Sequence, residues 1–194
     1  MPALRELRRL IAITRSEQIA RRYLVTNGFD ASLTMLGLVV GFRATEKSSP
    51  EIALAACFGT SVALAVSGFV STYASESAEM QRDLHDLTRA MLDDLDESAH
   101  RRATRYVPIL VAAVSGLSPF VVAQLIAAPL WLHRLAIPLA LPTFEVSIAM
   151  ALVVLFLFGA LLGHVGRGGR VVAGLRLLAV GILTAILIAL AAPS

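Results

Sequence analysis

Five apolar stretches, each about as long as a lipid bilayer is thick, constrain this sequence more than any other feature. They lie at 24–42, 51–75, 106–132, 144–163 and 171–192. A helix needs about 20 apolar residues to cross the hydrocarbon core, and backbone polar groups inside that core must be satisfied within the segment. The mean hydropathy of +0.74 agrees with this setting. We therefore expect one domain, an all-α integral membrane bundle of five transmembrane helices.

The basic residues predict how the chain crosses the bilayer. Fourteen of the 17 arginines and lysines precede the first span, lie in the connections after spans two and four or, for Arg176, lie near the start of span five; the other three lie in the remaining connections. The side richer in arginine and lysine is normally cytoplasmic. We expect the N-terminus in the cytoplasm and the C-terminus on the opposite side. The predicted organisation is a cytoplasmic amphipathic N-terminal helix (1–23), spans one and two (24–75), a short cytoplasmic acidic helical segment (76–105) and spans three to five (106–194).

Several classes of protein are disfavoured. The only cysteine, Cys57, lies in an apolar stretch, so neither a disulfide framework nor a thiolate metal cluster is expected. The basic residues flank spans without the pattern of a nucleic-acid-binding surface. No HExxH, GxSxG or P-loop motif occurs. We expect neither an enzyme nor a tightly bound cofactor, and no nucleic-acid partner.

Span one contains one carboxylate, Asp30. A charged side chain inside a bilayer costs roughly 2.5–3.5 kcal/mol on insertion scales, so it usually serves a function there. Spacings of three and four place it on a helical face with Asn27, Thr34, Gly37 and Gly41. Two structural alternatives stay open: the glycines pack against another helix, and the acid reaches the headgroups near a helix N-terminus.

Hydroxyl groups follow one side of span two and lead into the acidic segment: Thr60, Ser67, Ser71 and Ser75. The segment from Glu76 to Glu97 contains eight of the 14 acidic residues of the chain. Carboxylates on a shared helical face, beginning with Glu76, Glu79 and Asp83, can supply oxygen ligands to a divalent cation. The alternatives are hydroxyls that bond their own backbone and a solvated helix of i,i+4 ion pairs. An apolar stripe on the opposite side favours docking on a partner helix, as in a dimer: Met80, Leu84, Leu87, Met91 and Leu95.

Short motifs in spans one and two resemble the vacuolar iron transporter family. They are Asn-Gly-Phe-Asp at 27–30, Leu-Val-Val-Gly at 38–41, Gly-Phe-Val-Ser at 68–71, and the later Glu79. The resemblance implies a five-span homodimer that exports ferrous or related ions from the cytoplasm in exchange for protons, along a path between spans one and two at the dimer axis. It implies a path carboxylate at Asp30 and a metal-gathering acid at Glu79. The chain departs from the family at Gly68, where the family has glutamate, and at Leu64, where it has methionine.

The predicted function is therefore that of a proton antiporter that exports Fe²⁺ or Mn²⁺ through the membrane. Its predicted path residues are Asp30, Thr34, Ser67 and Ser71, and its predicted metal ligands are Asp30, Glu76, Glu79 and Asp83. The alternative is a non-transporting membrane protein of the same fold that binds a partner through its acidic cytoplasmic helix. The glycine at position 68 favours this alternative.

Overall fold

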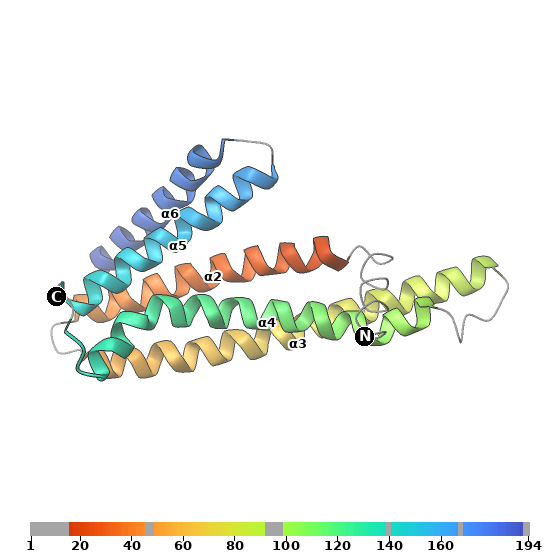
Figure 1. Ribbon diagram of the computed structural model, residues 1–194, viewed down its shortest axis with the longest axis horizontal. Coiled ribbons are helices and arrows are strands. Elements are labelled where there is room, and N and C mark those ends of the chain that lie inside the picture. The colour runs from red at the N-terminus through yellow and green to blue at the C-terminus, as the bar shows by residue number, and fades with distance from the viewer. Residues whose placement is uncertain (1–15, 46–48, 92–98, 139–140, 167–168, 192–194) are drawn as a thin grey trace.

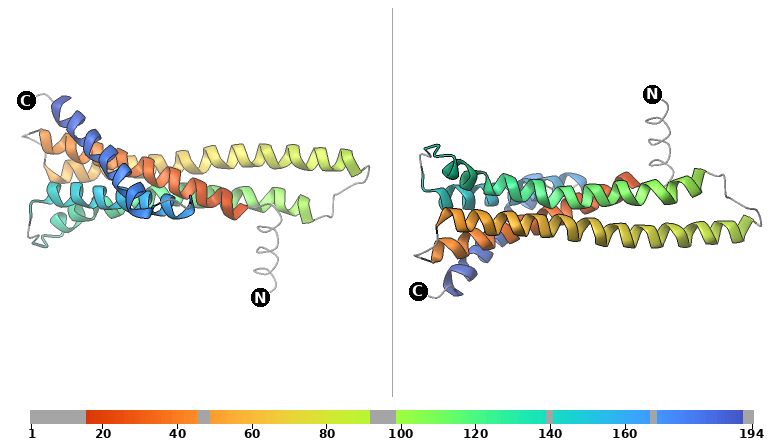
Figure 2. Two further views of the ribbon diagram at one scale, coloured as in Figure 1. Left: turned by 90° about the horizontal axis from the view of Figure 1, so that it is seen from above. Right: turned by 90° about the horizontal axis from the view of Figure 1, so that it is seen from below.

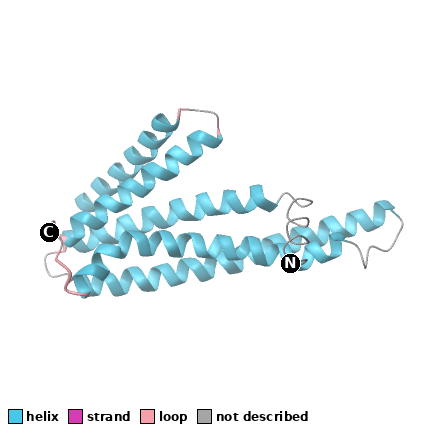
Figure 3. Cartoon of the chain, in the orientation of Figure 1, coloured by secondary structure: helices cyan, strands magenta, loops and turns pink. Residues whose placement is uncertain are grey.

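The computed structural model describes residues 16–45, 49–91, 99–138, 141–166 and 169–191. Every regular element in these ranges is a helix, and the five are α2 (Ser16–Ala44), α3 (Pro50–Met91), α4 (Ala99–Arg134), α5 (Thr143–Val165) and α6 (Arg170–Ala191) (Figure 3). All five are long and apolar enough to span a membrane. The expected all-helical chain with five membrane-length helices is confirmed. The N-terminal helix expected at 1–23 lies outside the described residues, apart from the start of α2 at Ser16.

Successive helices run in opposite directions, as short connections between long helices require. Helices α3 and α4 lie side by side along their lengths, and α2 packs against α4 (Figures 1 and 2). Helices α5 and α6 form a hairpin that stays close to α2 at one end and diverges from it toward the 166–169 turn (Figure 1). The ends of α3 and α4 nearest the 92–98 connection project beyond the start of α2 (Figure 1).

The main core lies in the half of the bundle where the chain runs from α2 into α3. Met35, Leu36 and Val39 of α2 are fully buried there with side chains of the other helices, among them Ile126 of α4 and Leu155 of α5. Burying such a side chain contributes about 1.5–3 kcal/mol in water; in lipid the same contacts act through close packing. This core holds α2 at the centre of the bundle.

Small residues join α5 to α6, as the spacing of Gly159 and Gly163 predicts. A Cβ atom at Gly159 would lie 2.6 Å from the carbonyl oxygen of Ala173, and one at Gly163 would lie 2.7 Å from the Ala173 Cβ. The two backbones therefore approach more closely than any larger residue would permit. The outer side of α6 remains exposed and apolar, as lipid contact requires, for example at Leu187 and Leu190.

One ion pair and one histidine–carboxylate contact connect helix ends at the side of the core. Arg43 Nε donates to Glu145 Oε1 at 2.7 Å and joins the end of α2 to the start of α5. His133 Nε2 lies 3.6 Å from Glu51 Oε1 and connects the end of α4 with the start of α3. Both contacts are exposed to a large extent, so each contributes little to stability.

The acidic segment expected at 76–105 is built from extensions of two apolar helices. Helix α3 continues without interruption from its apolar part through Glu76 to Met91, and α4 begins at Ala99. No proline or glycine occurs between Ser71 and Met91, so nothing in the sequence ends the helix there. The acids at 93–97 lie outside the described residues.

Candidate functional site

Asp30 lies on a side of α2 that no other helix of the described chain covers, and its side chain is exposed. The backbone carbonyl of Asp30 accepts a hydrogen bond from Thr34 Oγ1 at 2.8 Å. The Thr34 hydroxyl therefore bonds its own helix, a common arrangement for threonine in apolar helices. The carboxylate itself is left open to whatever lies against this face of α2.

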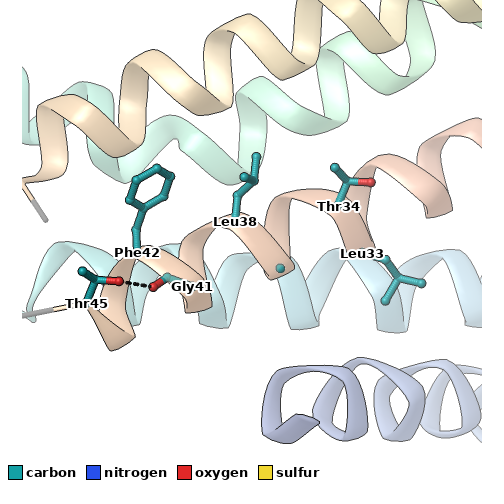
Figure 4. Close-up of a pocket in the computed structure, with 7 residues that line it drawn as sticks. Leu33, Thr34, Leu38, Gly41, Phe42 and Thr45 are labelled. Atoms are coloured by element: carbon teal, nitrogen blue, oxygen red, sulfur yellow. Dashed lines mark hydrogen bonds between the residues drawn. The ribbon is translucent and has the colours of Figure 1, made fainter. Parts of the chain in front are cut away.

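A groove of about 520 Å³ continues along the same helix from Thr34 toward its end. Figure 4 shows Leu38 and Phe42 pointing to one side of α2 and Leu33 to the other. Gly41 meets no atom within 4 Å of the position that a Cβ would take, and at Gly37 only Ile188 of α6 comes near, at 3.3 Å. Gly41 therefore borders open space, whereas Gly37 lies in close contact with α6. The lining is Leu33, Thr34, Gly37, Leu38, Gly41, Phe42 and Thr45.

The hydroxyl stripe predicted on span two faces outward. Ser67, Ser71 and Ser75 are exposed and Thr60 is half-buried. Ser71 Oγ donates to the carbonyl of Gly68 at 3.5 Å, a contact within its own helix. Among the described residues, no hydrogen bond joins Asp30 or Thr34 to Ser67 or Ser71. The four predicted path residues are therefore not gathered into one site inside a single chain.

A different set of polar groups is buried where α2, α3 and α4 meet, and we call it the seam network: Asn27, Gly68, Thr72 and Ser115. Asn27 Nδ2 donates to Ser115 Oγ at 2.6 Å and to the Ser115 carbonyl at 3.1 Å. Ser115 Oγ donates to the carbonyl of Gly68 at 3.1 Å, and Thr72 Oγ1 lies 2.6 Å from Ser115 Oγ. Because a serine hydroxyl carries one proton, Thr72 is the donor to Ser115. The expectation that Asn27 shares the face of Asp30 is wrong, since the amide turns to α4.

Glu76 lies one turn beyond Thr72 on the same inward side of α3. Its side chain is only 3% exposed, and it lies near Tyr23 and Arg22 of α2. Glu79 and Asp83, by contrast, are exposed. Glu76 thus differs in burial from the two acids with which the sequence groups it. Spacings of three and seven place all three on one helical face, and Glu79 lies near Glu76, but Tyr23 and Arg22 of α2 lie against Glu76 alone among the three.

Gly68 lies in a close contact between α3 and α4. A Cβ atom at Gly68 would lie 3.0 Å from the Ser115 carbonyl oxygen and 3.5 Å from Asn27 Nδ2. A glutamate at this position would have to displace α4 or Asn27. The contact between α3 and α4 therefore favours glycine at position 68.

The described residues contain no group of three or more histidine, cysteine, aspartate or glutamate side chains placed to hold a metal ion. The metal ligands predicted from the sequence, Asp30, Glu76, Glu79 and Asp83, are distributed over an open face, a buried seam and an exposed helix extension. A metal site that uses them must draw on a second copy of the chain or on water. The ligand set stays a prediction.

Sequence reasoning missed Ser115, the centre of the seam network, although a signal was present. Small residues recur at 112, 115 and 116 in span three, and at 65, 68 and 72 in span two. Such spacing is typical of two membrane helices in close contact. The contact is tight: a Cβ at Gly116 would lie 2.6 Å from the Ala65 carbonyl oxygen.

The chain is similar to an uncharacterized protein of the archaeon Methanocaldococcus jannaschii. The two are 24% identical over 170 residues, which cover 86% of this chain and 85% of the relative. No family model matches the sequence, and no solved structure matches it. The similarity extends over most of both chains, but the relative is uncharacterized and suggests no activity. A functional proposal must therefore be argued from the geometry of this chain.

Proposed function

We propose that this protein is a membrane transporter that exports Fe²⁺ or Mn²⁺ from the cytoplasm, as a homodimer and in exchange for protons. The observation that carries the proposal is the exposed carboxylate of Asp30 on the open face of α2. Asp30 lies about 9 Å along the helix axis from residue 24, the start of the predicted span. A carboxylate that faced lipid at this depth would be costly, so water, a cation or a second copy must cover it.

A second copy of the chain provides that cover. The groove that begins one turn beyond Asp30 is open, Gly41 leaves space in it, and the outward side of α3 carries Ser67 and Ser71. Two copies that meet through these faces would bring carboxylate and hydroxyl oxygens to one seam. Oxygen ligands with water suit a hard or borderline divalent cation.

The extension of α3 supplies the entrance in this proposal. Glu79 and Asp83 are exposed on α3, toward the end of the helix that projects beyond the start of α2 (Figure 1). With the N-terminus in the cytoplasm, this extension lies on the cytoplasmic side, where its carboxylates gather the cation before it reaches Asp30. Asp30 would then exchange the cation for a proton, because a metal ion and a proton compete for the same oxygens.

Ion flux into proteoliposomes tests the proposal. The full chain is reconstituted and uptake of Fe²⁺ and of Mn²⁺ is measured under a proton gradient, with Asp30→Asn and the matched control Asp86→Asn. Asp86 is an exposed aspartate on the α3 extension, outside the predicted ligand set. Flux should fall more than about tenfold in Asp30→Asn, since one lost charge-assisted contact costs about 1.5–3 kcal/mol. Equal flux in the two variants would contradict a path through Asp30.

The second candidate function is that of a membrane protein that binds a partner through the acidic α3 extension. The observation that favours it is the contact at Gly68, which leaves no room for the carboxylate of the transporter family. The same flux assay separates the two candidates. Sealed vesicles that contain folded wild-type protein and show no flux of either ion would favour partner binding over transport.

A further inference from the structure

A second cavity lies between α2 and α5, toward the start of α2. Its volume is about 190 Å³, room for roughly six water molecules. Two arginines, two uncharged polar residues and three aliphatic residues surround it: Arg21, Arg22, Gln18, Thr26, Val25, Leu161 and Leu162. Neither the transport path nor the seam network uses this cavity.

The cavity exists because α2 and α5 separate beyond a tight contact. At Gly28 the ring of Phe158 lies against the α2 backbone, and a Cβ there would come within 2.4 Å of the ring. One turn toward the start of α2, Val25 and Thr26 still line the same space as Leu161 and Leu162, but no side chain of the described residues fills it. The result is a wedge in which Val25 is buried and the two leucines and two arginines are exposed. The divergence of the α5–α6 hairpin from α2 opens the same side (Figure 1).

The chemistry of the wedge matches a phosphate ester attached to an apolar chain. A guanidinium group binds phosphate oxygens in a bidentate manner, and the side chains of Gln18 and Thr26 offer further donors. The aliphatic side chains of the lining suit the carbon atoms that follow the phosphate. The arginines are exposed beside the predicted first span, where long basic side chains reach from apolar surface to the headgroup layer.

We propose that this cavity binds the headgroup of an anionic phospholipid in the cytoplasmic leaflet, with Arg21 and Arg22 on its phosphate. Basic pockets between membrane helices on the cytoplasmic side select anionic lipids in this manner. The volume accommodates a phosphate and its glycerol carbons, so the acyl chains stay in the bilayer along the diverging α5. The proposal does not depend on transport, and it holds for either candidate function.

Native mass spectrometry of the full chain in detergent tests the proposal. Phosphatidylglycerol and phosphatidylcholine with the same acyl chains are added at equal concentration, and bound lipid is counted. The wild type should prefer phosphatidylglycerol, and Arg21→Gln should lower its affinity about fivefold. Arg21 is the better position to change, because Arg22 also lies over the Tyr23 ring and near Glu76. Arg82→Gln, which removes an exposed arginine on the α3 extension, should leave the preference unchanged.

Three further measurements make the outcome decisive. Arg21→Lys should retain most of the preference, and Leu162→Trp should remove it while keeping both arginines. Equal binding of the two lipids, or a preference that survives both Arg21→Gln and Leu162→Trp, would overturn the proposal. Inorganic phosphate that displaced phosphatidylglycerol at millimolar concentration would also overturn it, by assigning the site to a soluble anion. Unchanged gel-filtration profiles show that each variant is folded.

Discussion

Helix α3 carries polar residues on two sides, which differ in burial: the inward side is hydrogen-bonded to α4, and the outward side is exposed. On the inward side, Thr72 and the Gly68 carbonyl complete their hydrogen bonds with Ser115 of α4. On the outward side, Ser67 and Ser71 are exposed. A buried polar group without a partner is costly, so the inward set is explained by structure alone. The outward set has no such explanation within one chain.

Helix α2 repeats this division over a single turn. Asn27 points into the seam and donates two hydrogen bonds to Ser115, whereas Asp30 is exposed on the open face. The neutral amide therefore belongs to the closed side and the carboxylate to the open side. This difference separates residues that hold the bundle together from those available to a cation, water or a second copy.

The largest effect on stability is expected from closing the space at the seam. In Gly116→Ala the new Cβ would meet the Ala65 carbonyl oxygen at 2.6 Å, and a backbone atom cannot move aside cheaply. We expect a loss of about 1–3 kcal/mol of unfolding free energy. In the matched variant Gly41→Ala, nothing lies within 4 Å, and the better helix propensity of alanine should add up to about 1 kcal/mol. Denaturant unfolding in detergent measures the free energy of unfolding of both variants. Equal values for Gly116→Ala and Gly41→Ala would contradict the difference in packing between the seam and the open face.

A smaller loss is expected from removing the central hydroxyl of the seam network. Ser115→Ala leaves Thr72 and Asn27 without a hydrogen-bond acceptor at Oγ, although Asn27 keeps the Ser115 carbonyl. The expected cost is about 0.6–1.7 kcal/mol, the range for hydrogen bonds between membrane helices. Ser71→Ala on the outward side should change unfolding by less than about 0.5 kcal/mol. A cost at Ser71 as large as that at Ser115 would show that the outward hydroxyls are structural too.

The smallest effect is expected at the exposed ion pair between α2 and α5. Arg43→Gln removes the 2.7 Å contact with Glu145, and side chains this exposed gain little from pairing. Unfolding free energy should drop by about 0–1 kcal/mol, and less at high salt because ions screen the pair. A salt-independent loss above this range would mean that the pair is covered in the assembled protein. That result would extend the covered surface beyond the face around Asp30.

Much of the fold could be predicted because it depends on segment length and hydropathy. The apolar stretches at 24–42 and 144–163 lie within α2 and α5, and the absence of a helix breaker after Ser71 predicts that α3 continues. The rotation of each helix could not be predicted in the same way. Polar residues on α3 occur at steps of three and four all around the apolar segment, so several faces look equally polar in sequence. Position along the helix matters too: Glu76, Glu79 and Asp83 share a face, yet only Glu76 is buried, because side chains of α2 lie against it.

The sequence alone determined five membrane-length helices and the position of a carboxylate within the first of them. Apolar length and the need to satisfy the backbone are local properties, and they can be read from one segment at a time. The tertiary structure decided which polar side chains are already satisfied, because Ser115 can accept from Asn27 and Thr72 only when three helices meet. The tertiary structure also places Asp30 outside the seam where α2, α3 and α4 meet. Contacts between segments far apart in the chain depend on how the helices are turned, and no single segment carries that information.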